Sequence, residues 1–123
     1  MMKNRLFACL LTFILFAACG KDNHLHVSDS QLTGLWIMSG SQEYWRYRAD
    51  HTGVYWDASQ DITEEESNLT FSWSLDEDVL THVSTGAIGN QAVPKVYTIK
   101  DINSNYMRWE DDYGLSYTFE KTE

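Results

Sequence analysis

The sequence has few cysteines, prolines and basic residues. Only two of its 123 residues are cysteine and one is proline, and 9 lysines and arginines stand against 18 aspartates and glutamates. So acidic a chain repels nucleic acid and anionic lipid headgroups, and we expect no nucleic-acid partner. A basic protein or a divalent cation would suit the charge, although a solvated acidic surface is its commoner meaning.

Residues 1–18 have the pattern of a secretory signal peptide. Lys3 and Arg5 precede an apolar run from Leu6 to Phe16, and small residues follow it. A transmembrane helix needs about 20 apolar residues, so this run is too short to span a bilayer stably. The pattern predicts export and removal of the segment. That would leave seven basic residues against eighteen acidic ones, a net charge of about −11.

The residues around Cys19 indicate lipidation. The pair Ala17-Ala18, followed by Cys19 and Gly20, resembles the lipobox of bacterial lipoproteins, although Phe16 stands where leucine is more usual. The resemblance implies a diacylglyceryl thioether on Cys19, cleavage before it and acylation of the new amino group, for example with palmitate. Cys9 would leave with the signal, which excludes a disulfide within one mature chain. Several acyl chains anchor a protein stably to a membrane. The alternative is an ordinary secreted protein.

Residues 19–31 are polar and predict a flexible tether between lipid and domain. Gly20 after the cysteine resembles lipoproteins directed to the outer membrane. Lys21-Asp22 resembles the export tag of surface lipoproteins in Bacteroidetes-type bacteria. These resemblances imply a lipid-anchored outer-membrane protein, on a face that they leave open. His24 and His26 have side chains that ligate metals, but no further ligand lies at a suitable spacing, and we predict no metal and no cofactor.

Alternating side chains predict a protein made of strands. From Leu69 to Leu75, large apolar residues alternate with threonine and serine, so Leu69, Phe71, Trp73 and Leu75 should face a core. Similar alternation between turn residues predicts seven further strands, and only residues 28–34 indicate a helical turn. The predicted strands are 35–39, 43–49, 54–57, 69–75, 79–84, 95–103, 106–110 and 115–120.

Eight short strands joined by hairpins predict an all-β fold. An antiparallel up-and-down (meander) barrel over residues 32–121 leaves no bare sheet edge; a two-sheet sandwich is the alternative. Gly34-Leu35-Trp36 and the hairpin from Tyr47 to Tyr55 resemble lipocalin-like proteins. That resemblance implies that Trp36 plugs the closed end of the barrel. The arginine that packs on this tryptophan in lipocalins has no clear counterpart near the last predicted strand.

Catalytic motifs are absent from the sequence. It contains no Gly-x-Ser-x-Gly and no His-Glu-x-x-His run, and the pairs Asp76/Asp78 and Asp111/Asp112 fall in predicted turns, where water would solvate them. The acidic segment 59–68 offers oxygens for calcium but lacks the regular spacing of a calcium loop. We therefore predict a non-enzymatic protein with no catalytic residues.

Large aromatic residues on the predicted inward face are the candidate ligand-binding groups. They would line a cavity for a small hydrophobic or amphipathic molecule. Their bulk favours the alternative, a filled barrel that serves as a docking or accessory subunit for an envelope protein. Residues 39–44 resemble a loop of small lipoprotein inhibitors of C-type lysozyme, with a spacing one residue longer. The candidates are Trp45, Tyr47, Trp56, Phe71, Trp73, Tyr97, Trp109 and Tyr117, with Phe119 beside them.

Overall fold

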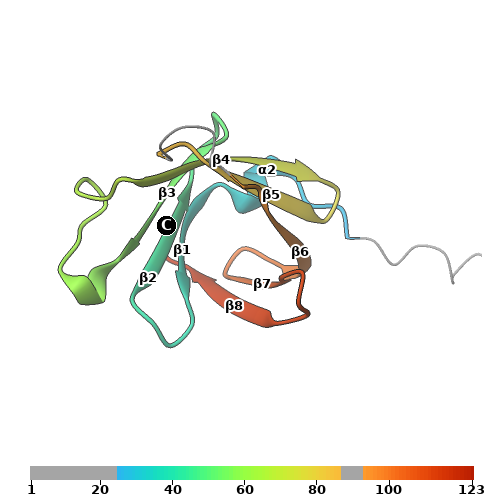
Figure 1. The fold of residues 1–123 in the computed structure, drawn as a ribbon. Helices are drawn as coiled ribbons and strands as arrows, with labels where there is room; N and C mark the ends of the chain where they lie inside the picture. Colours follow the sequence, from blue (N-terminus) through green and yellow to red (C-terminus); the bar gives the residue numbers. More distant parts are fainter. Residues whose placement is uncertain (1–24, 87–92) are drawn as a thin grey trace, which may run out of the picture.

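Eight strands form a closed antiparallel barrel in the computed structural model, which describes residues 25–86 and 93–123 (Figure 1). Each strand pairs with the next along the chain, and β8 returns to β1. The predicted meander is therefore confirmed, and the barrel is compatible with a lipocalin-like fold. The strands are β1 (Gly34–Met38), β2 (Glu43–Tyr47), β3 (Thr52–Asp57), β4 (Leu69–Asp76), β5 (Val79–Ser84), β6 (Lys95–Ile102), β7 (Tyr106–Glu110) and β8 (Ser116–Lys121).

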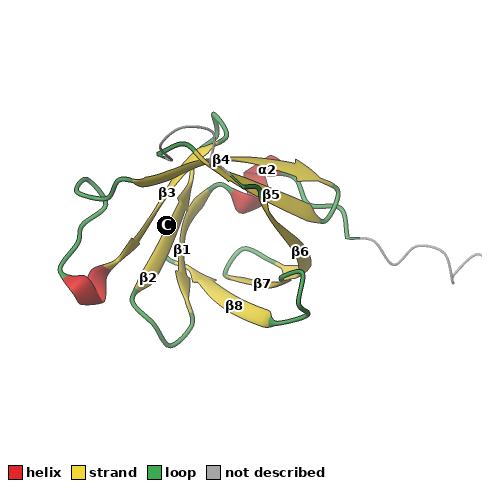
Figure 2. Cartoon of the chain, viewed as in Figure 1, coloured by secondary structure: helices red, strands yellow, loops and turns green. Residues whose placement is uncertain are grey.

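Two short helical segments accompany the strands (Figure 2). Helix α2 (Asp29–Leu32) precedes β1, and the 3-10 turn η1 (Ala58–Gln60) follows β3. The backbone N–H of Ser28 donates to Gln31 Oε1 at 2.9 Å and so starts the predicted helical turn. Among the described residues, no helix combines the length and the apolar character needed to cross a membrane.

Helix α2 and Trp36 close one end of the barrel. Leu32 and Trp36 are both fully buried, and the Trp36 indole N–H donates to the Leu32 carbonyl oxygen at 2.8 Å. His51, in the turn between β2 and β3, holds the helix from the other side because its Nε2 lies 2.5 Å from Asp29 Oδ2. The Lys121 ammonium of β8 lies 5.4 Å from the centre of the Trp36 ring. The last strand thus places a cation over this ring. The residue is a lysine, whereas the lipocalin resemblance implies an arginine.

The way β1 joins the C-terminal residues explains why a glycine, Gly34, stands two residues before Trp36. The Leu35 N–H donates to the Glu123 carbonyl oxygen at 3.2 Å, and the Thr122 N–H donates to the Leu35 carbonyl oxygen at 2.8 Å. Gly34 has φ +139°, and a Cβ on it would lie 2.5 Å from the Glu123 oxygen. Only glycine allows the chain end to come so close.

The ordered domain begins earlier than the sequence indicates. Val27 is 4% exposed and belongs to the main core, and Leu25 packs against that core. The Val27 N–H donates to the Glu77 carbonyl oxygen at 3.1 Å, in the turn between β4 and β5. The last part of the predicted tether, residues 25–31, therefore belongs to the barrel. Of the two histidines considered above as metal ligands, His24 lies outside the described residues, and His26 is exposed.

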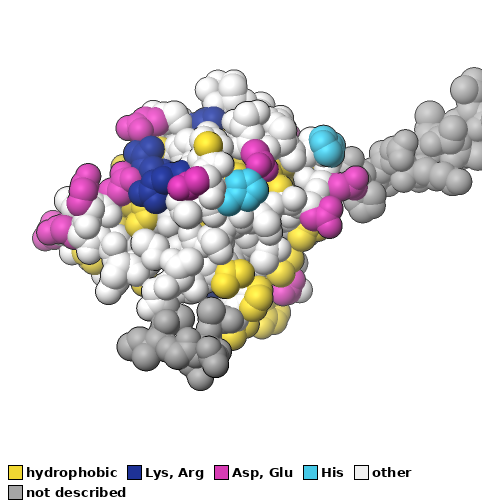
Figure 3. Space-filling view, turned by 90° about the horizontal axis from the view of Figure 1, so that it is seen from above, with side chains coloured by type: hydrophobic (Ala, Val, Ile, Leu, Met, Phe, Trp, Pro, Cys, Tyr) yellow, Lys and Arg dark blue, Asp and Glu magenta, His cyan; other side chains and the backbone are white. Residues whose placement is uncertain are grey.

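A second small core lies outside the barrel wall. Leu35, Val54 and Trp56 are buried there, and Ile62 packs against them. The acidic segment 59–68 covers this face, where the Glu64 carboxylate accepts from Arg46 Nε at 2.6 Å. Figure 3 shows a face on which the Lys and Arg side chains gather mainly in one group bordered by acidic ones. The outer wall is thus partly covered, which adds a layer to one side of the sheet.

Gly53 is a tight point of the packing inside the barrel. It lies in β3, opposite Tyr47 on one side and Phe71 on the other. A Cβ at this position would run into the Phe71 ring and would lie 2.5 Å from the Arg46 carbonyl oxygen. The ring therefore occupies space that any other residue would need.

We expect Gly53→Ala to lower the free energy of unfolding by about 1–3 kcal/mol, the usual cost of overpacking a core. Urea denaturation followed by tryptophan fluorescence measures it. Ser74→Ala, at an exposed position of β4, is the matched control and should change stability by less than about 0.5 kcal/mol. Equal midpoints for the two variants would contradict this account of Gly53.

Candidate functional site

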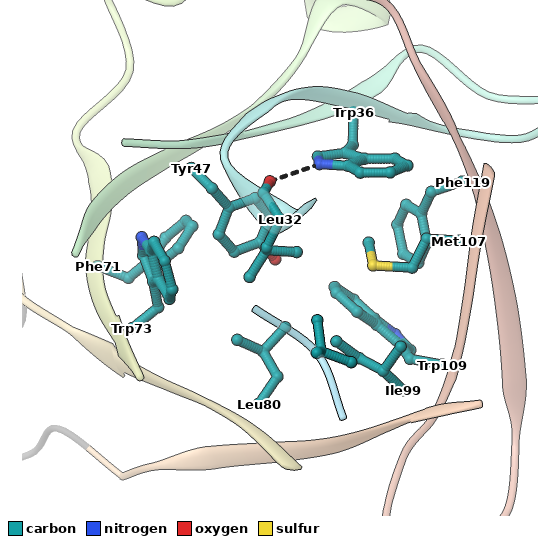
Figure 4. Packing of buried hydrophobic residues seen from close by; sticks show 11 residues of the cluster. Leu32, Trp36, Tyr47, Phe71, Trp73, Leu80, Ile99, Met107, Trp109 and Phe119 are labelled. Atoms are coloured by element: carbon teal, nitrogen blue, oxygen red, sulfur yellow. Dashed lines mark hydrogen bonds between the residues drawn. The ribbon is translucent and has the colours of Figure 1, made fainter. Parts of the chain in front are cut away.

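The interior of the barrel has two different halves. At the end closed by α2, buried side chains from seven strands and the helix pack against one another (Figure 4). The prediction of a barrel filled by its own side chains is correct for this half. Its members include Leu32, Trp36, Tyr47, Trp73, Leu80, Ile99, Met107 and Phe119.

The other half encloses a cavity of about 730 Å³. Its volume falls within the range of about 300–1,000 Å³ that is typical of small-molecule sites. The prediction of a completely filled barrel is therefore wrong for this half. Every strand contributes at least one inward residue to the lining, among them Met38, Trp45, Tyr55, Phe71, His82, Tyr97, Trp109 and Tyr117.

Five of the eight predicted ligand-binding residues line this cavity: Trp45, Phe71, Tyr97, Trp109 and Tyr117. Two others, Tyr47 and Trp73, are buried in the packed core instead. Tyr47 packs behind the cavity wall, because its ring lies edge-on to Phe71 at 5.6 Å. The structure therefore brings seven of the eight residues into one interior.

Trp56 is the exception, and its predicted inward position is wrong. It belongs to the outer core, where its ring stacks on Tyr44 at 5.0 Å and 9°. Tyr55 faces inward in its place. Since β2 and β3 carry aromatic residues at adjacent positions, each strand has a ring on both faces, and alternation alone cannot tell which ring points inward.

Aromatic faces make up most of the cavity wall. The Trp45 ring packs against Tyr55 at 4.7 Å and lies edge-on to Trp109 at 6.3 Å. The Tyr97 ring in turn stacks on the Trp109 ring, with the centroids 4.4 Å apart and the planes at 20°. These rings hold one another in place, so the wall is formed before any ligand arrives.

His82, which the sequence analysis missed, lies among these rings. It is 7% exposed, stacks on Phe71 at 4.5 Å and has its Nε2 at 2.8 Å from the Tyr47 hydroxyl. Burial and, to a smaller extent, the charge of Lys95 together lower the pKa of His82 to about 3. Burial also raises the pKa of Tyr47 well above its usual value. Both partners are therefore uncharged near neutral pH. The sequence signal for His82 was its position in the alternation of β5, where Leu80, His82 and Ser84 lie on the inward face.

Charged groups lie at the mouth of the cavity. Glu43, Asp111, Asp112 and Lys95 contribute to its lining. The Tyr55 hydroxyl donates to Glu43 Oε1 at 2.8 Å, and burial together with this bond raises the pKa of Tyr55 to about 12. The Tyr117 hydroxyl lies across the mouth and donates to Asp111 Oδ2 at 3.5 Å. Two tyrosine–carboxylate pairs therefore border the opening.

Large apolar side chains are exposed around the same opening. Leu69, Val93 and Tyr113 line it, and Leu115 lies in the neighbouring turn between β7 and β8. Within the described ranges, no group of three or more histidine, cysteine, aspartate or glutamate residues could hold a metal ion. The chemistry that this arrangement offers is an aromatic wall, neutral hydrogen-bonding groups in the interior and carboxylates at the rim.

Comparison with known proteins adds no relative. No protein-family model, no curated protein and no solved structure matches the chain. The cavity itself must therefore carry any argument about function.

The buried imidazole makes stability depend on pH. Because the pKa of His82 is lower in the folded state than in the unfolded chain, the unfolded chain binds more protons between about pH 6.5 and pH 3, and acid in this window favours unfolding. Between pH 7 and pH 5 we expect this group to remove about 2 kcal/mol of the free energy of unfolding. His82→Phe, which has no proton to bind, should lose less over the same interval, as measured by urea denaturation at each pH. Parallel losses in the two proteins would contradict a neutral buried imidazole.

Proposed function

We propose that this protein is a non-enzymatic lipoprotein, anchored to the outer membrane of a Gram-negative, Bacteroidetes-type bacterium, that binds a small hydrophobic or amphipathic molecule in the mouth of its barrel. The single observation that supports it best is the cavity of about 730 Å³ that all eight strands line. A barrel that served only as a scaffold would have no need of this cavity.

The wall of the cavity suits such a ligand. Aromatic rings bury apolar surface and offer flat faces, while hydroxyls and carboxylates at the rim can orient a polar group. An amphipathic molecule would place its apolar part against rings such as Trp45 and Trp109 and its polar part near Glu43 or Asp111. The carboxylates lie at the rim and the imidazole in the interior, so the cavity favours binding over acid–base or nucleophilic catalysis.

The anchor rests on the residues around Cys19 and on how near the domain begins. The described chain starts at Leu25, six residues after this cysteine. Six residues span at most about 20 Å when fully extended. Acyl chains on Cys19 would therefore hold the barrel close to the surface of the bilayer.

Docking of an envelope protein is a second candidate, supported by the apolar side chains exposed at the mouth. Tyr113 is 90% exposed and Val93 74%. A partner that covers this rim would also close the cavity. Docking is therefore favoured if small probes leave the tryptophan fluorescence unchanged and a single protein is captured by a tagged copy.

Filling the mouth should abolish ligand binding without disturbing the fold. Ser84 is exposed at the rim of the cavity, and Ser74 is exposed on the outer face of β4. We expect Ser84→Trp to weaken binding of the uncharged probe N-phenyl-1-naphthylamine at least tenfold, measured by its fluorescence. Ser74→Trp should bind like the original protein. If Ser84→Trp binds the probe unchanged, the ligand does not enter through this mouth.

Loss of the thiol should release the protein from the membrane. We expect Cys19→Ser to incorporate no labelled palmitate and to leave the membrane fraction, since no other residue would carry the acyl chains. Cell fractionation with metabolic labelling measures both effects. A Cys19→Ser protein that still carries label and still sediments with membranes would rule out this anchor.

A further inference from the structure

The mouth of the cavity carries an unequal set of charges. Three of its lining residues, Glu43, Asp111 and Asp112, are acidic, and one, Lys95, is basic. His82, the only other lining residue that could be positive, is neutral near pH 7 because burial lowers its pKa to about 3. The lining therefore has a net negative charge.

Hydrogen bonds at the rim hold the carboxylates of Glu43 and Asp111 in position. The hydroxyls of Tyr55 and Tyr117 already donate to Glu43 and Asp111, at 2.8 and 3.5 Å. These bonds fix each carboxylate beside an aromatic ring. The Asp111 Oδ1 atom also accepts from the backbone N–H groups of Tyr113 and Leu115, at 2.9 and 3.0 Å. A carboxylate has about four lone-pair sites, so both groups can still accept a donor from a ligand.

Aromatic rings line the cavity next to these carboxylates. The faces of aromatic rings carry negative charge and attract a cation within about 6 Å, tryptophan most strongly. Trp45, Trp109 and Tyr97 form such a wall next to the charged rim. Two independent features, ring faces and carboxylates, therefore favour the same sign of charge in the ligand.

We infer that the cavity selects an organic cation, an ammonium or quaternary ammonium group on an apolar body. The apolar body lies against the wall that the Trp45 and Trp109 rings form, and the positive group lies at the mouth near the carboxylates of Glu43 and Asp111. This inference rests on the proposed function, because it specifies the ligand of the same cavity. The acidic surface of the chain as a whole adds attraction at a distance, since it concentrates cations around the protein.

Three probes with the same tail test the inference. Octyltrimethylammonium, octanol and octyl sulfate differ in the charge of the head group, and all can be used below the concentrations at which they form micelles. Quenching of tryptophan fluorescence or calorimetry gives each affinity. We expect the cation to bind at least tenfold more tightly than octanol, and octyl sulfate to bind more weakly than octanol. The preference for the cation should shrink as salt is added, because salt screens the rim charges.

Paired substitutions show whether the rim causes the preference. The double variant Glu43→Gln/Asp111→Asn keeps an acceptor for the Tyr55 hydroxyl and for the backbone N–H groups of Tyr113 and Leu115, and removes two charges. It should lose most of its preference for the cation over octanol. The control Asp76→Asn/Glu120→Gln removes two charges at exposed positions outside the cavity lining and should keep the preference. Asp112→Asn, a single change in an exposed turn, should reduce cation affinity about two- to threefold and serves as a second test should the double variant not fold.

The outcomes separate the two proposals. Equal affinity for the cation and for octanol, or a preference that survives removal of the rim carboxylates, overturns the inference and leaves a ligand-binding cavity. Failure of all three octyl probes and of N-phenyl-1-naphthylamine to bind overturns the proposed function as well.

Discussion

Closure of the sheet between β1 and β8 is the constraint on which the rest of the structure depends. Because each strand pairs on both sides, all inward side chains share one interior, and none can be moved to a second layer. The join needs Gly34, where a side chain would collide with the carbonyl oxygen of Glu123. It also brings Lys121 over the Trp36 ring. The glycine and the tryptophan of the Gly-x-Trp sequence therefore serve the same join, one by leaving space and the other by filling it.

The two ends of the barrel differ because only one of them receives a plug. At the closed end, α2 inserts Leu32, and the segment before it adds Val27. At the other end the connections between strands run around the opening, and their apolar side chains stay exposed. The same alternation of inward residues thus gives a packed core in one half and an aromatic-lined cavity in the other. This difference suits the cavity to bind a ligand, because the packed half holds the walls of the open half rigid.

The sequence predicted the strands and their order because period-two alternation and turn residues are local features. β5 and β7 begin and end at the expected residues, and β4 extends one residue further. The inward face was harder to predict in β2 and β3, where rings occur at neighbouring positions; Trp56 was misplaced for this reason. His82 was missed because a single histidine in a strand is a weak signal. Whether large rings fill a barrel or line a cavity depends on how far the walls stand apart, which no single strand encodes.

The point at which the chain reaches the barrel gives the molecule an orientation. Val27 joins the turn between β4 and β5 at the plugged end, so a lipid anchor at Cys19 would lie on that side. The opening would then point away from the bilayer, toward the surrounding aqueous space. A ligand would then reach the acidic, aromatic rim directly from the aqueous phase, without crossing the bilayer that anchors the protein.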